Sequence, residues 1–239
     1  MISIDLDKKP IKPIIIEGFP GFGFVSTIVT EYLVKHLNAK SIGRITSDKL
    51  SPVIAIHNSK LIYPLEIFYD EKTNIMILQA VTPIEGLEWE IAGAVIELAK
   101  QVKAKEIIGL EGVHSNVTIQ EPKVFFYTNK IEKEKALKAK KIESLDEGII
   151  LGPTAALLIK SKDLSFTAFF VEAASNLPDN KAASKIIQIL DDYLGLKIDP
   201  KPLLQKAKEF ETKIKQIISQ VEGAKVTKEQ KEKNLGYMG

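Results

Sequence analysis

The chain has no cysteine among its 239 residues. This absence excludes disulfide bridges, thiolate nucleophiles and metal sites built on cysteine. No segment approaches the roughly 18 consecutive apolar residues that a membrane-spanning helix needs. The first ten residues carry Asp5, Asp7 and two lysines, whereas a signal peptide needs an apolar stretch there. We therefore expect a cytoplasmic protein without a membrane anchor.

Neither sign of charge is in large excess, because 33 basic residues stand against 31 acidic ones and the net charge is +2. Such a chain has no global attraction for nucleic acid or for an anionic membrane. Aromatic residues make up only 7% of the sequence, which disfavours a surface for stacking bases. We expect neither nucleic acid nor a membrane as a partner. Abundant isoleucine, lysine and glutamate without cysteine is typical of a thermophile.

What the chain does have is an alternation of short β-rich segments and amphipathic helices, which predicts an α/β fold with an open, mostly parallel sheet. Strands are predicted at residues 13–16, 41–46, 53–56, 60–63, 65–69, 75–78, 106–110, 124–127 and 165–171. Helices are predicted at residues 25–37, 87–102, 132–141, 153–160 and 181–194. Residues 111–114 are predicted as the turn that follows a strand.

The glycine-rich segment Gly18–Thr27 lies between a predicted strand and a predicted helix. Its residues 21–26 approximate G-x-G-x-x-G, with Ser26 in the third place. Free N–H groups at a helix start favour an anion. However, the segment has three phenylalanines and no lysine, so it is not a Walker loop. Two interpretations stay open: a nucleotide-binding or nucleoside-phosphorylase-like enzyme that uses the Gly21–Ser26 turn, or a structural turn.

The sequence offers few groups for catalysis. His36, His57 and His114 lie far apart and form no metal-binding motif, and no G-x-S-x-G segment is present. Glu111 and Glu172, each after a predicted strand, are the best candidates for a polar site at the carboxyl edge of the sheet. With no nucleophile near them, we expect no enzyme, no catalytic residue, no metal and no cofactor.

The sequence changes character after Gly195, and we predict three regions. Residues 1–195 form an α/β core domain, residues 196–222 an amphipathic helix and residues 223–239 a flexible tail. The predicted helix has a heptad seam, which fits packing on its own domain or contact with another helix. The seam consists of Leu203, Ala207, Phe210, Ile214, Ile217 and Val221.

The order of motifs resembles the proteasome assembly chaperone family, in its archaeal branch. The residues of the first turn that resemble the family's signature loop are Pro20, Gly21, Gly23, Val25 and Ser26. Residues 152–158 resemble the second glycine-led helix start of that family. Glu172, followed by Pro178 and Asp179, resembles its late acidic region.

This resemblance implies a three-layer α/β/α sandwich of the phosphorylase/hydrolase-like kind. It also implies a non-enzymatic homo-oligomer, for example a tetramer, that binds the α subunits of the proteasome core particle as an assembly chaperone or activator. Family members dock a tail with a tyrosine second from the end, after a large apolar residue. The residues here that resemble this tail, with the tyrosine third from the end, are Leu235, Gly236, Tyr237, Met238 and Gly239.

Overall fold

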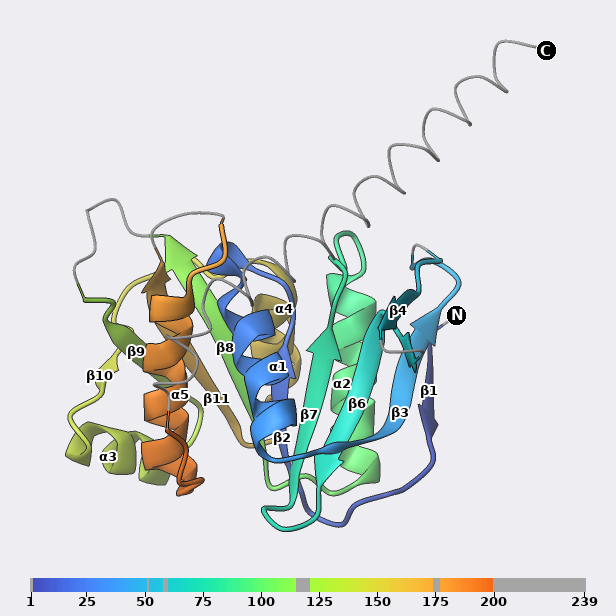
Figure 1. Cartoon of the computed structure of the whole chain (residues 1–239). Helices are drawn as coiled ribbons and strands as arrows, with labels where there is room; N and C mark the ends of the chain where they lie inside the picture. The colour runs from blue at the N-terminus through green and yellow to red at the C-terminus, as the bar shows by residue number, and fades with distance from the viewer. Residues whose placement is uncertain (1, 51, 58–59, 115–120, 174–176, 200–239) are drawn as a thin grey trace.

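A computed structural model describes residues 2–50, 52–57, 60–114, 121–173 and 177–199, which form a nine-stranded sheet with helices on both faces (Figure 1). Across the sheet the strands are β1 (Ile2–Leu6), β3 (Lys40–Ser47), β6 (Leu65–Asp70), β7 (Ile75–Ala80), β2 (Ile14–Gly18), β8 (Glu106–His114), β11 (Phe166–Ala173), β9 (Val124–Thr128) and β10 (Glu143–Ser144). The hairpin of β4 (Ala55–His57) and β5 (Lys60–Ile62) is separate from the sheet. It confirms the predicted hairpin.

The expectation of a mostly parallel sheet is wrong. The central strands β7, β2, β8 and β11 run parallel, and β9 runs parallel to β10. The four remaining pairs, β1/β3, β3/β6, β6/β7 and β11/β9, are antiparallel. The link between β6 and β7 is only residues 71–74, and so short a link joins antiparallel strands alone.

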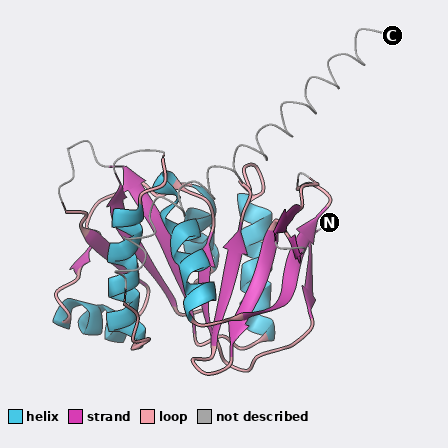
Figure 2. Cartoon of the chain, viewed as in Figure 1, coloured by secondary structure: helices cyan, strands magenta, loops and turns pink. Residues whose placement is uncertain are grey.

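The helices lie in two layers, one on each face of the sheet (Figure 2). α1 (Val25–His36) and α5 (Asn180–Leu194) contact each other on one face, and α2 (Glu88–Gln101) and α4 (Gly152–Lys160) on the other. α3 (Ile131–Ala139) lies beside β9 and β10. This arrangement confirms the predicted three-layer α/β/α sandwich. Within the described ranges, no helix is both long and apolar enough to cross a membrane.

The core has two halves because the central strands are buried on both faces, as in other parallel sheets. Successive residues of β2 point to opposite sides. Ile15 therefore packs in the half beneath α2 and α4, whereas Ile16 packs in the half beneath α1 and α5. Both side chains are fully buried. The apolar run that predicted a buried strand thus packs against the helix layers on both faces of the sheet.

Two further differences from the prediction concern the edge strands and the end of β8. The edge strands β1 and β10 were not predicted. The predicted turn at residues 111–114 is wrong, because β8 continues to His114, paired with β11 along its length. The prediction that the helix ends at Leu194 is confirmed, since α5 ends there and Gly195 adopts a φ of +68°. The predicted helix at residues 196–222 and the tail at residues 223–239 lie outside the described residues, apart from residues 196–199.

A buried ionic network joins the helices α3 and α5 to one end of the sheet. Glu106 begins β8 and is only 3% exposed. Its carboxylate accepts hydrogen bonds from Lys133 Nζ of α3 at 2.5 Å and Tyr193 Oη of α5 at 3.0 Å. Thr167 Oγ1 of β11 donates a third, at 2.6 Å. One carboxylate therefore joins four elements.

Removal of the lysine should be costly, because a buried charge that loses its partner destabilises the folded state. We expect Lys133→Met to lower the free energy of unfolding by about 3 kcal/mol. The matched control is Lys135→Met, an exposed lysine of the same helix, which should change it by less than about 0.5 kcal/mol. Urea denaturation at pH 7 measures the free energy of unfolding of both variants. Equal losses in both would contradict the network's role.

Candidate functional site at the carboxyl edge of the sheet

The glycine-rich turn lies where β2 ends and α1 begins. It holds Pro20, Gly21 and Gly23 of the predicted signature, and the other two signature residues, Val25 and Ser26, begin α1. Residues 22–24 form a short 3-10 helix, in which Gly23 and Phe24 have φ angles of +66° and +49°. The Ser26 hydroxyl is buried and donates a hydrogen bond to the carbonyl of Phe19. Ser26 therefore holds the turn closed from inside.

The glycines of this turn make room for strand β8. A Cβ atom on Gly21 would lie 2.6 Å from Oε1 of Glu111. On the other side of the contact, a Cβ atom on Gly112 would lie 2.0 Å from the carbonyl oxygen of Phe22. The close approach of backbone to strand thus explains both glycines. This packing accounts for the glycines of the turn without a bound phosphate.

Beneath the turn, two carboxyl groups share one hydroxyl. Glu17, at the end of β2, has no exposed surface. Thr154 Oγ1, in the first turn of α4, lies 2.7 Å from Glu111 Oε2 and 3.4 Å from Glu17 Oε1. A hydroxyl has a single hydrogen to donate. When Thr154 donates it to Glu111, Glu17 completes the bridge by donating its own proton to Thr154.

The pKa values of both groups favour this protonated pair. Burial raises the pKa of Glu17 to about 8, and the nearby charge of Glu111 adds to the rise. Burial also raises the pKa of Glu111, to about 7, against the opposing hydrogen bond from Thr154. Within the described part of the chain, neither carboxyl forms an ion pair with a lysine or arginine. At neutral pH the pair therefore holds at least one proton.

Glu111 also borders an open cleft of about 470 Å³. The other cleft residues come from the turn, from β8 and from the segment before α4. They are Phe22, Gly112, Val113, His114, Leu145, Glu147, Gly148, Ile149, Ile150 and Leu151. The cleft has an apolar wall and an acidic floor, which makes it the best candidate site in the described structure.

The sequence identified only part of this site. Glu111 was predicted to lie at the carboxyl edge, and it does. Glu172 does not join it, because its carboxylate instead accepts the backbone N–H of Lys123 at 3.1 Å. Glu17 and Thr154 were missed. The signal for Glu17 was present, since a carboxyl group ends the otherwise apolar run of β2.

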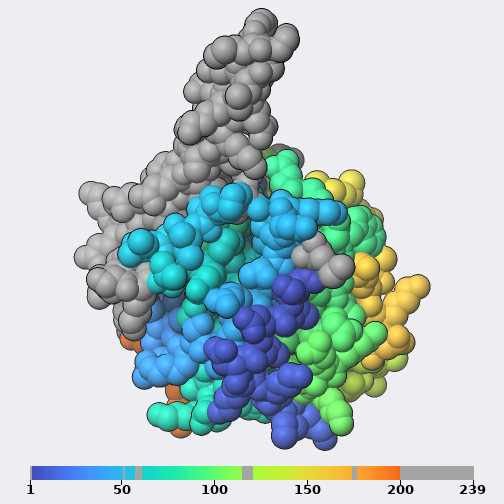
Figure 3. All heavy atoms as spheres, turned by 90° about the vertical axis from the view of Figure 1, so that its right-hand side faces the viewer, coloured from blue at the N-terminus to red at the C-terminus, as the bar shows by residue number. Residues whose placement is uncertain are grey.

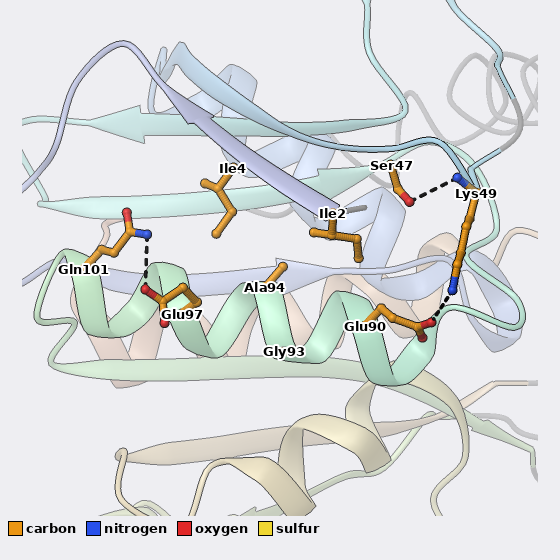
Figure 4. Close-up of a pocket in the computed structure, with 9 residues that line it drawn as sticks. All are labelled: Ile2, Ile4, Ser47, Lys49, Glu90, Gly93, Ala94, Glu97 and Gln101. Atoms are coloured by element: carbon orange, nitrogen blue, oxygen red, sulfur yellow. Dashed lines mark hydrogen bonds and ion pairs between the residues drawn. The ribbon is translucent and has the colours of Figure 1, made fainter.

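A second hollow, of about 500 Å³, lies at the β1 edge between that strand and α2 (Figure 4). Figure 3 views this edge, with the dark blue atoms of β1 beside the green ones of α2. Ile2 and Ile4 line it. Its charged rim is already paired, since Lys49 bonds Glu90 at 2.9 Å. Among the described residues that line it, this hollow has no unpaired cationic side chain.

Two of the three histidines, His36 and His114, pack against aromatic rings. The ring of His36 stacks on Tyr32, and the ring of His114 meets Phe22 edge-on at 5.1 Å between centroids. Among the residues described, no group of three or more histidine, aspartate or glutamate side chains is placed to hold a metal ion. The side chain of His57 lies outside that description.

The buried pair should make stability depend on pH. The unfolded chain releases these protons near pH 4.5, whereas the folded chain keeps them up to about pH 7 to 8. Folding therefore binds protons within this window, and stability falls as the pH rises through it. Each proton bound on folding lowers the free energy of unfolding by about 1.4 kcal/mol for every pH unit of this rise. We expect Glu17→Gln to flatten the decline between pH 5 and pH 8.

The measurement is the free energy of unfolding in urea at pH 5, 6.5 and 8. The matched control is Glu132→Gln, an exposed glutamate on α3, which should keep the slope of the unaltered protein. An unchanged slope in Glu17→Gln would show that the pair does not bind the proton.

The acidic floor should also reject phosphate. Glu111 Oε1 occupies the space next to Gly21, and the first residues of α1 are buried. We expect no rise in melting temperature with nucleosides, ATP, NAD or inorganic phosphate. A ligand at 100 times its dissociation constant would add about 2.7 kcal/mol. A reproducible shift that Gly21→Ala removes would reverse this conclusion.

Known proteins share both the sequence pattern and the fold. The chain matches the PAC2 family over residues 15–218. An uncharacterized protein of Methanocaldococcus jannaschii is 28% identical over 214 residues, which cover 87% of this chain and 86% of that protein. Pyrococcus furiosus PbaA, described as an archaeal homolog of proteasome-assembly chaperone, has a TM-score of 0.85 at 27% identity over 94% of this chain and 100% of its own.

Pyrococcus furiosus PbaB, described as an archaeal proteasome activator, has a TM-score of 0.74 at 24% identity, over 90% of this chain and 98% of its own. It shares the fold. These matches confirm the resemblance to the proteasome assembly chaperone family that the signature loop indicated. Because the family match spans most of its length, the chain belongs to the PAC2 family.

Proposed function

We propose that this protein binds the proteasome core particle and acts as an assembly chaperone, an activator or both, without catalysing a reaction itself. The observation that carries the proposal is the similarity to PbaA, a homolog of proteasome-assembly chaperone, over nearly the whole of both chains. The shared fold of PbaB, a proteasome activator, supports the same assignment. Membership of the PAC2 family agrees with it.

We infer that the contact with the core particle is made by the C-terminal tail, on the ring of α subunits. The tail tip comprises Leu235, Gly236, Tyr237, Met238 and Gly239. An aromatic side chain is the usual anchor in a small interface, because it buries a large area with few rotatable bonds. These residues lie outside the described structure, so the proposal rests on their chemistry.

The same proposal divides the chain into a core domain at residues 1–195, a helix at residues 196–222 and a flexible tail at residues 223–239. α5 ends at Leu194, which suits the first boundary. One tail would bind weakly after its ordering cost. A homo-oligomer, for example a tetramer, would present several tails and raise their effective concentration. The heptad seam of the predicted helix would set the subunit number, in a cytoplasmic assembly.

The nucleotide-binding alternative gains no support from the site. Its central element, the Gly21–Ser26 turn, faces a carboxyl group rather than a basic one. A bound phosphate there would meet like charge at short range. The protein-binding proposal needs no ligand in the turn.

The proposal predicts that loss of the tail weakens association with the core particle. An archaeal core particle is mixed with the full chain, with Tyr237→Ala and with a chain ending at residue 234. We expect at least tenfold weaker association for both variants, because loss of a central aromatic anchor costs about 2 kcal/mol or more. Co-migration and peptide hydrolysis are measured.

The matched control is Tyr237→Phe, which keeps the ring and should retain most of the association. If the full chain neither co-migrates with core particles nor alters their peptidase activity, the proposed function is wrong. If the truncated chain associates as well as the full chain, the tail is not the contact.

A further inference from the structure

The cleft at the carboxyl edge has features that the proposed tail contact does not use. Its outer wall exposes large apolar side chains from the segment before α4. Ile149 is 88% exposed and Leu151 is 76% exposed. Both line the cleft together with the half-buried ring of Phe22. Exposed aliphatic side chains beside a hollow mark a surface that gains stability when a partner covers it.

The charge of the cleft has one sign. Among the described residues, its lining includes Glu111 and Glu147 and no lysine or arginine. Neither carboxyl group has a basic partner within the described residues. In the described part of that lining, His114 supplies the remaining titratable side chain, and its ring is turned edge-on to Phe22. An occupant that pairs with these carboxyl groups must therefore bring a cation.

The two carboxyl groups differ in how they are held. Glu147 is exposed in the loop between β10 and α4 and can adjust to a ligand. Glu111 is held from behind by the Thr154 hydroxyl, at 2.7 Å, and its Oε1 fills the space that a Cβ atom on Gly21 would need. A fixed carboxyl group loses little conformational freedom when it binds. Glu111 is thus the specific contact and Glu147 the adaptable one.

We propose that this cleft binds a lysine or arginine side chain carried on an apolar segment of a partner protein. The aliphatic stem of that side chain would lie against Ile149 and Leu151, and its charged end would reach Glu111. The class of partner, a protein, rests on the proposed function. The site itself rests on the shape and charge of the cleft.

Such binding should release protons. A cation beside Glu111 favours its charged form and so lowers the pKa of that carboxyl. The groups around it are Glu17 on β2, Thr154 on α4, His114 on β8 and Glu147 in the loop. Glu17 keeps its own proton through the Thr154 bridge. At pH 7 the complex should therefore hold fewer protons than the free protein.

The test uses acetyl-Leu-Lys-Leu-amide as the probe and acetyl-Leu-Gln-Leu-amide as its neutral analogue, with the full chain at pH 7. Calorimetry is run in phosphate and in Tris, whose ionisation enthalpies differ. We expect the lysine peptide to bind at least fivefold more tightly than the analogue. Its binding enthalpy should differ between the two buffers, since protons pass to the buffer.

Three variants locate the binding. Glu111→Gln and Glu147→Gln should each weaken the lysine peptide at least fivefold, and Glu111→Gln should remove the difference between buffers. Glu132→Gln, on α3 at the far end of the sheet, should change neither the affinity for the lysine peptide nor the difference between buffers. Because Glu147 is exposed, its substitution tests the cleft even if Glu111→Gln proves unstable.

Equal binding of both peptides, or undiminished binding in Glu147→Gln, would overturn the proposal. Binding seen only in a chain that ends at residue 222 would assign the cleft to the protein's own tail and would also overturn it. No core particle is present in this experiment. Its failure would leave the proposed function intact, and failure of core-particle association would leave the cleft result standing.

Discussion

The hydroxyl group of Thr154 has one hydrogen and two carboxyl groups to satisfy, and the architecture of the carboxyl edge depends on that bridge. Glu17 is the last residue but one of β2, Glu111 lies near the end of β8, and Thr154 lies in the first turn of α4. The bridge therefore joins two neighbouring strands to the helix layer behind them. It is stable only when the pair keeps a proton, since two buried charges so close would repel each other.

The glycine-rich turn is shaped by the same bridge. With Glu111 held in place, its carboxyl group fills the volume that a side chain at position 21 would need. The turn then packs so closely on β8 that Gly112 also cannot carry a side chain. A strand, a glycine-rich turn and a helix are shared by many folds that bind phosphate. Here the chemistry beneath the turn differs, which shows again that a fold does not fix a function.

Local patterns were enough to predict much of this fold. The apolar stripe of α2 and the turn between Asp70 and Asn74 depend on neighbouring residues. So does the cap of α5, where the Asp179 carboxylate accepts the N–H groups of Lys181 and Ala182. The strand β1 has only five residues at an edge, and its alternating pattern is too short to separate it from a polar N-terminus.

The candidate site was harder to predict because its members meet only in the tertiary structure. Glu17 and Thr154 are 137 positions apart in the chain. Nothing in the sequence near Thr154 indicates a carboxyl partner. The extension of β8 to His114 likewise depends on pairing with β11, more than fifty residues further on. Glu111 could be predicted because a carboxyl group directly after an apolar strand is visible in the local sequence, without knowledge of its tertiary partners.

The backbone N–H of Asp179, which caps α5, also donates a hydrogen bond of 2.9 Å to the carbonyl of Gly23 in the turn. During synthesis the ribosome makes the turn early and its donor 156 positions later, from the difference between these residue numbers. At about 5 to 20 residues per second, that interval lasts roughly 8 to 30 seconds. For this time the nascent chain carries an unfinished turn. This hydrogen bond of the turn therefore cannot form until Asp179 has been synthesised.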